Sequence, residues 1–226
     1  MSDATSLLAT LQHADSFFPA GGVAFSWGLE TLITEGSFRA DRDLHRLLIG
    51  QLERRWATFD RCALVAVFET VPDLAGVARI DQHIEAMTLA RELREGSRRA
   101  GGSLLGVHER LGTSGAAEYR AAVRAGSACG HLPVVQGLVW RGAGMTVDQA
   151  QAASVHTFCV SLLGAALRLG AIGHLHAQET LVGLRAEMAK LLAQPPPNFE
   201  DCHTYTPMAE IAVMRHEVQS ARLFSN

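Results

Sequence analysis

The stretch TVDQAQAASVHTFCVSLLGAALRL, Thr146 to Leu169, decides the fold class of this chain. Thr146 and Gln149 form the Ser/Thr-x-x-Glu/Gln pattern of a capping box, which marks the N-terminus of a helix. The following residues are mostly apolar or small, and the segment from Phe158 to Leu167 carries no charge at all. A helix that is apolar around most of its circumference is normally buried by other elements. We therefore expect this segment to be the buried core helix of a helical protein.

Helical spacing of apolar residues continues on both sides of this stretch. Leu44, Leu48, Leu52 and Trp56 recur at four-residue intervals behind Asp41, which we expect to be the N-cap of their helix. The same spacing, together with prolines and capping residues, predicts helical segments over 62–71, 80–90 and 179–192 and a short one from Thr206.

No run of alternating apolar and polar residues is long enough to predict a strand. Val134 to Trp140 is the nearest to one, and its pattern fits either a short helix or an extended segment. The predicted fold class is all-α, a single-domain bundle of about eight to ten helices over residues 1–226, with a flexible tail from about residue 220.

The composition excludes several classes of protein. Of the 226 residues, 48% are hydrophobic and 19% charged, and a net charge of −3 points to neither nucleic acid nor an anionic membrane as a partner. Lys190 is the only lysine and has no glycine-rich loop before it, so the chain has no P-loop. The four cysteines are all at least 30 residues apart, which is typical of a reduced cytoplasmic protein with neither a redox pair nor a CxxC metal site.

The residues that could carry chemistry form no catalytic constellation. His174 and His176 are two apart, so on a helix they point in different directions, and Cys202-His203 in a loop is the better ligand pair. Ser26 stands in half of a G-x-S-x-G elbow without a strand before it. We predict no catalytic residue and no stable metal site. The arginines between 91 and 124 alternate with glutamates, so they form either a salt-bridged solvated face or a docking surface for an acidic partner.

Five blocks of sequence occur in the order known from one family. The first runs from Leu11-Gln12 through Pro19, Gly21-Gly22 and Ser26 to Gly28-Leu29-Glu30. The others are Arg94, Ser97, Gly101, Leu104 and Leu105; then His131, Pro133 and Gly137; then Arg168-Leu169, Gly173 and Gln178; and last His216-Glu217 with Arg222-Leu223-Phe224-Ser225. Together they resemble the urease accessory protein UreF family, with departures at Val23, His174 and Ala177.

The resemblance implies an all-α chaperone without enzymatic activity. Such a protein forms a homodimer, binds UreD (also called UreH), recruits and modulates the GTPase UreG, and delivers nickel to apo-urease. Nickel would pass through without a stably bound cofactor. The partner-binding residues that the resemblance implies are Pro19, Gly21, Gly22, Ser26, Gly28, Glu30, Arg168, Gln178, His216, Glu217, Arg222, Leu223 and Phe224.

Several alternatives stay open at this point. A small all-α enzyme that encloses a ligand, or a pure scaffold without a role in metal transfer, would show a similar pattern. Leu162 to Leu169 fits a dimer interface or burial inside one chain equally well, and the resemblance favours the dimer. Leu223 and Phe224 either pack onto the parent domain or dock into UreD with Arg222.

Overall fold

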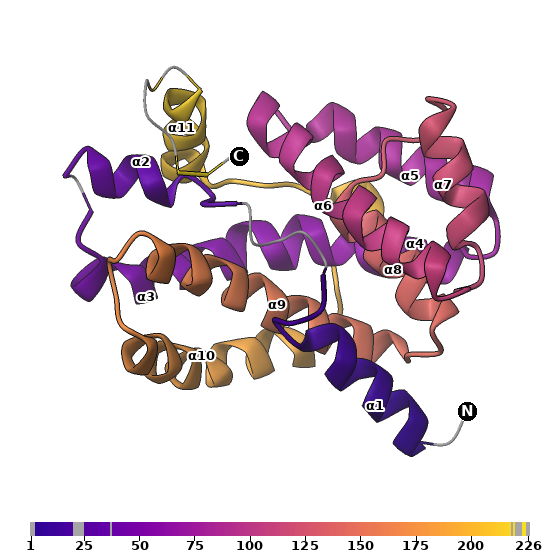
Figure 1. Cartoon of the computed structure of the whole chain (residues 1–226), viewed down its shortest axis with the longest axis horizontal. Helices are drawn as coiled ribbons and strands as arrows, with labels where there is room; N and C mark the ends of the chain where they lie inside the picture. The colour runs from indigo at the N-terminus through magenta and orange to yellow at the C-terminus, as the bar shows by residue number, and fades with distance from the viewer. Residues whose placement is uncertain (1–2, 20–24, 37, 218, 220–222, 225–226) are drawn as a thin grey trace.

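The computed structural model describes residues 3–19, 25–36, 38–217, 219 and 223–224. In this part of the chain all regular secondary structure is helical, and loops connect the helices (Figure 1). The helices are α1 (Asp3–Ala14), α2 (Leu29–Thr34), α3 (Ala40–Gln51), α4 (Arg61–Thr70), α5 (Leu74–Met87), α6 (Arg91–Arg110), α7 (Ala116–Arg124), α8 (Leu132–Gly142), α9 (Val147–Arg168), α10 (His174–Ala193) and α11 (Pro207–His216). A π-helical segment, Leu52–Asp60, joins α3 to α4, and a 3-10 turn spans Phe199–Asp201. Since α3, the π-helical segment and α4 are continuous, the described chain has ten α-helices and no strand, which confirms the predicted fold class.

The helix α9 lies in the middle of the molecule, between α10 on one side and the continuous α3–α4 helix on the other (Figure 1). Its capping box is formed: the Thr146 hydroxyl accepts a hydrogen bond from Gln149 N at 3.2 Å, and Gln149 Oε1 accepts one from Thr146 N at 2.9 Å. Among the described helices, α9 alone is long and apolar enough to cross a membrane, but 61% of its apolar window is buried inside the protein. It is therefore packed as a core helix.

The apolar end of α9 is covered by the chain itself. Leu162, Leu163, Ala165 and Ala166 are at most 3% exposed and belong to a core cluster with residues of α2, α3 and α10. Of the two explanations for the apolar Leu162–Leu169 pattern, burial within one chain is the one that the structure shows.

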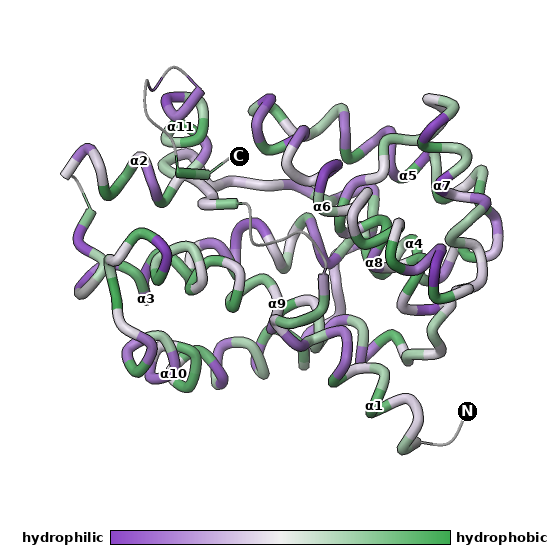
Figure 2. The backbone as a smooth tube through the Cα atoms, viewed as in Figure 1, coloured by the Kyte–Doolittle hydropathy of each residue, from purple (hydrophilic) through white to green (hydrophobic). Residues whose placement is uncertain are grey.

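Two large apolar clusters and a small third one around Val213 form the core of the described residues. The first surrounds Leu48, Leu52 and Trp56 and gathers side chains from α2, α3, α9, α10 and the π-helical segment. The second surrounds Tyr119 and Leu138 and gathers side chains from α4 to α9. The continuous α3–α4 helix and α9 contribute to both clusters, and along these helices apolar and polar residues alternate in patches (Figure 2). These two long elements therefore connect the halves of the bundle.

Local details differ from the sequence-based expectations. The helix α3 begins at Ala40 with Arg39 as its N-cap residue, and Asp43 Oδ2 accepts from Arg39 N at 3.1 Å, so Asp41 is not the N-cap. Val134 to Trp140 is helical, within α8. The helix α10 begins at His174, five residues before the predicted start at Glu179. The segment Leu52–Asp60 is π-helical, with i→i+5 hydrogen bonds, where the apolar spacing predicted a continuous α-helix.

The contact of α8 with α4 depends on Gly137. A Cβ atom at this position would lie 2.6 Å from the Leu64 carbonyl oxygen and 2.9 Å from Val67 Cβ. Both neighbours belong to α4, and the backbone oxygen cannot move aside as a flexible side chain would. The missing side chain of Gly137 therefore sets how closely the two helices approach.

We expect Gly137→Ala to lower the free energy of unfolding by about 1–3 kcal/mol, the usual cost of overpacking. The matched control is Gly102→Ala in α6, where a Cβ would meet nothing within 4 Å. There the better helix propensity of alanine should raise stability by about 0.5–1 kcal/mol. Urea unfolding followed by circular dichroism measures both values. Equal effects of the two substitutions would contradict the close α4–α8 packing.

Candidate functional site

A buried histidine joins residues from three helices that lie far apart in the sequence. His216, the last residue of α11, is fully buried. Its Nε2 atom lies 3.0 Å from Glu30 Oε2 on α2, and its Nδ1 atom lies 3.0 Å from Glu92 Oε2 on α6. Each ring nitrogen of His216 is therefore within hydrogen-bond distance of a carboxylate oxygen. This bridge ties α2, α6 and α11 together.

The Glu30 carboxylate also holds the C-terminal residues. Its Oε1 atom accepts from Leu223 N at 2.6 Å, and its Oε2 atom accepts from Phe224 N at 3.1 Å. Phe224 is 5% exposed, and the Arg168 guanidinium lies 4.9 Å from the centre of its ring, a cation–π arrangement. Phe224 thus packs onto the parent domain, the first of the two predicted alternatives for the tail. Leu223 is 64% exposed.

Gly28 positions α2 against α11. It is the N-cap residue of α2 with φ +81°, and a Cβ here would lie 2.7 Å from the Ala209 carbonyl oxygen of α11. Ser26 is buried, and its carbonyl oxygen accepts from Leu29 N at 2.9 Å. The N-cap residue of α2 is Gly28, two positions after Ser26.

The remaining residues implied by the resemblance are more scattered. Glu217, directly after α11, forms an ion pair with Arg91 at the start of α6. Pro19 is exposed, and Gln178 is exposed on α10, which lies away from α11 (Figure 1). Gly21, Gly22 and Arg222 lie outside the described residues.

An exposed apolar face runs along α11. Met208, Ile211 and Met214 are 43–55% exposed and recur every three residues, which places them on one side of the helix. The opposite side of α11 is buried through Ala209, Ala212, Val213 and His216. Tyr205, two residues before α11, is also more than 60% exposed. Sequence reasoning missed this face because α11 is apolar on both sides, and only the structure shows which side is covered.

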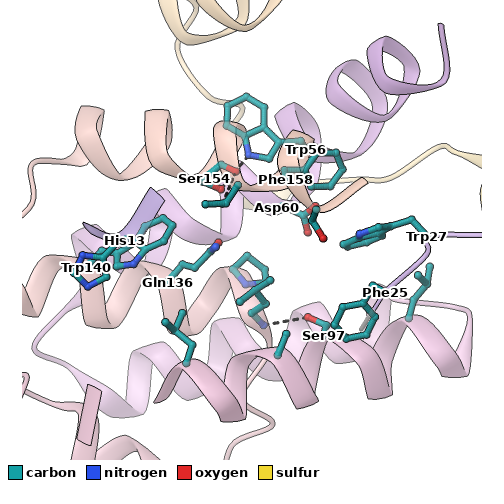
Figure 3. Close-up of a pocket in the computed structure, with 17 residues that line it drawn as sticks. His13, Phe25, Trp27, Trp56, Asp60, Ser97, Gln136, Trp140, Ser154 and Phe158 are labelled. Atoms are coloured by element: carbon teal, nitrogen blue, oxygen red, sulfur yellow. Dashed lines mark hydrogen bonds between the residues drawn. The ribbon is translucent and has the colours of Figure 1, made fainter. Parts of the chain in front are cut away.

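A small cavity lies between the two large core clusters. Its volume is about 90 Å³, and aromatic side chains form much of its wall: Phe25, Trp27, Trp56, Trp140 and Phe158 (Figure 3). Asp60, from the π-helical segment, also lines it, and burial raises the pKa of this carboxyl although Arg55 opposes the shift from 3.4 Å. Pockets for organic ligands usually enclose roughly 300–1,000 Å³. This cavity is smaller than that range and has room for several water molecules.

Known proteins identify the family. A sequence model of the UreF family matches residues 38–185. The urease accessory protein UreF of Paenarthrobacter aurescens (strain TC1) is 34% identical over 223 residues, which cover 98% of this chain and 98% of that protein. The protein of the same name from Trichodesmium erythraeum (strain IMS101) is 32% identical over 234 residues, covering 100% and 99%. This chain belongs to the UreF family. It is a urease accessory protein and not an enzyme, as the sequence predicted.

The arginines of this UreF-family chain between 91 and 124 are largely paired. Arg94 and Arg98 lie 3.4 and 3.5 Å from Glu85 Oε1, and Arg120 forms an ion pair with Glu109. These pairs favour the salt-bridged surface over a basic docking surface.

The Cys202-His203 pair does not form a joint ligand set. Cys202 is buried with its Sγ atom 3.7 Å from Met87 Sδ, whereas His203 is exposed and its Nδ1 lies 2.9 Å from the Asp201 carbonyl oxygen. Burial likewise raises the pKa of the Cys62 and Cys159 thiols to about 12, so they are inert at neutral pH.

We expect Glu30→Ala to lower the free energy of unfolding by about 3–5 kcal/mol, because it leaves His216 and Glu92 as an incomplete buried charge cluster. The matched control is Glu35→Ala, which removes an exposed pair with Arg215 at 3.1 Å and should change stability by less than about 1 kcal/mol. Chemical denaturation measures both. Similar small losses for both variants would show that the buried bridge does not hold α11 in place.

The pH dependence of stability should report on His108. This side chain is fully buried and stacks on His13 with ring centres 4.9 Å apart; burial, and then the charge of His13, lowers its pKa to about 4. Between pH 6.5 and 4 the unfolded chain therefore binds a proton at His108 that the folded chain does not, so stability falls as the pH falls. Relative to His108→Asn, the wild type should lose about 2–3 kcal/mol across this window in denaturation series at stepped pH. Parallel curves for the two proteins would contradict a buried neutral His108.

Proposed function

We propose that this chain is the subunit of the urease maturation complex that binds UreD (UreH), recruits the GTPase UreG and modulates its activity while nickel passes to apo-urease. The complex works in the cytoplasm, and the chain carries no permanent cofactor of its own. Membership in the UreF family supports a role in urease maturation. The observation that carries the partner-binding part is the exposed apolar face of α11.

The α11 face is suited to docking because it is rigid. Its buried side is fixed by the His216 bridge and by the close approach of Gly28 to Ala209. Met208, Ile211 and Met214 are therefore presented without a further loss of backbone entropy when a partner binds. Exposed apolar side chains gathered on one face of a folded protein mark interaction surfaces. We assign this face to UreD.

A second set of exposed apolar residues serves the homodimer. Leu7, Leu8 and Leu11 of α1 are 54–66% exposed, while the other side of α1 packs on α9. Since the apolar end of α9 is covered within the chain, we propose α1 as the contact with a second copy. Light scattering of the isolated chain and of the complex with UreD measures the oligomeric state, and a monomer in both would refute the homodimer.

We expect Ile211→Asp to weaken UreD binding at least about tenfold, because burying one large aliphatic side chain contributes roughly 1.5–3 kcal/mol. The matched control is Val182→Asp on α10, which also places a carboxylate at an exposed apolar position, 53% exposed in the wild type. Titration calorimetry with purified UreD gives both affinities, and circular dichroism confirms that the variants are folded. Equal affinities for the two variants would place the UreD contact elsewhere.

Nickel incorporation into apo-urease distinguishes a role in metal transfer from a pure scaffold. If the chain acts in metal transfer, Ile211→Asp should reduce nickel incorporation into apo-urease in a reconstituted mixture containing UreD and UreG. A pure scaffold would also bind these partners. Omitting it from the mixture would, however, leave urease activation unchanged.

A further inference from the structure

A fully buried carboxylate organises the loop before α8. Asp81 of α5 accepts three hydrogen bonds through Oδ2: from Cys129 N at 2.7 Å, Gly130 N at 2.6 Å and the Tyr119 hydroxyl at 2.7 Å. Its Oδ1 accepts a fourth, from His131 N at 3.0 Å. Successive backbone N–H groups directed at one carboxylate define the loop conformation over residues 129–131.

The helix α6 closes the loop from the other side. A Cβ at Gly101 would overlap the Gly130 carbonyl oxygen, so the backbones of α6 and the loop are in direct contact. Ser97 Oγ, one turn earlier on α6, accepts from Leu132 N at 3.1 Å. The loop is therefore fixed on both sides before any ligand binds.

The loop places the Cys129 thiol and the His131 imidazole close to the Glu85 carboxylate of α5. Glu85 lies one helical turn after Asp81 on α5, and one ligand atom each from Glu85, Cys129 and His131 lie within 4.8 Å of one another. His131 is fully buried, with Nε2 2.8 Å from Glu85 Oε2, and its Nδ1 has no protein partner. Cys129 is half-buried, and the Glu85 side chain is 28% exposed, so the cluster is reached from the surface.

We propose that Glu85, Cys129 and His131 bind a divalent transition-metal ion of the Ni²⁺, Co²⁺ and Zn²⁺ class. A thiolate, an imidazole and a carboxylate are the ligands that these ions select, whereas Mg²⁺ and Ca²⁺ require oxygen ligands throughout. Three protein ligands leave a coordination position for water or for a ligand from a partner. The site deepens the nickel-passage part of the proposed function and rests on it, whereas partner docking at α11 does not require it.

The charges around the cluster make the site an exchangeable one. Arg94 and Arg98 lie 3.4 and 3.5 Å from Glu85 Oε1 and compete with a cation for that oxygen, while Glu85 Oε2 faces His131. The buried Asp81 carboxylate, which binds the backbone of the same loop, attracts a cation and so opposes the repulsion from the two arginines. A site with three ligands and two neighbouring guanidinium groups binds a metal ion reversibly, in contrast to the closed four-ligand sites that hold structural zinc.

The test uses the full-length reduced chain and Co²⁺ as a spectroscopic probe. Titration should produce a thiolate-to-cobalt charge-transfer band that saturates at one ion per chain and that Ni²⁺ or Zn²⁺ abolishes by displacement. Cys129→Ser should remove the band and weaken binding at least about tenfold, as expected for the loss of one ligand. Glu85→Gln should weaken binding but keep the band. Thermal melts confirm that both variants are folded.

The control is Cys202→Ser, which alters the cysteine of the other candidate pair and should retain the band. The proposal is refuted if the wild type shows no band, if Cys129→Ser keeps it, or if Cys202→Ser loses it. The result is independent of the docking proposal. A chain that binds cobalt through Cys129 but not UreD would refute docking alone, and a chain that binds UreD without a cobalt site would refute the metal site alone.

Discussion

The Glu30 carboxylate is the group on which the arrangement of α11 and of Leu223 and Phe224 depends. It accepts a hydrogen bond from His216 and two from the backbone at Leu223 and Phe224, so one buried side chain of α2 holds both α11 and the backbone at Leu223 and Phe224. A carboxylate in a low-dielectric interior is stable only when its oxygens are satisfied in this way. The exposed face of α11 is oriented by the same contacts, because the side that His216 anchors determines which side remains in solvent.

Asp81 has the corresponding role in the other half of the bundle. It binds the backbone N–H groups at 129–131 as Glu30 binds those at 223–224, and in each case a helix carries the carboxylate while an irregular segment supplies the donors. Irregular segments leave backbone N–H groups unpaired, and buried carboxylates satisfy several of them at once. Among the motif residues, Glu30 and His216 support the C-terminal segment and Ser97 and Gly101 support the loop before α8, together with Asp81, which lies outside the blocks.

Most of the residues to which we assign a binding role lie outside the motif blocks. Ile211 and the methionines beside it, like Cys129, stand outside the motif blocks but lie on the segments that those blocks support. Glu85 and His131 show how the two roles meet, since His131 lies in a motif block and its side chain contacts a carboxylate that is open to solvent. Rigid support below an exposed group is the arrangement by which binding sites are preorganised.

The sequence by itself determined the fold class, the central helix with its capping box and the family, because these depend on local spacing, on capping pairs and on the order of short motifs. Only the tertiary structure decided which apolar faces are covered. It buried Leu162 and Phe224 within the chain and left Ile211 exposed, although all three stand in similarly apolar contexts. It also placed Glu85 beside Cys129 and His131, and Glu30 beside His216. Such pairs are separated by 44 to 186 residues, and their contact follows from helix packing, which no local pattern encodes.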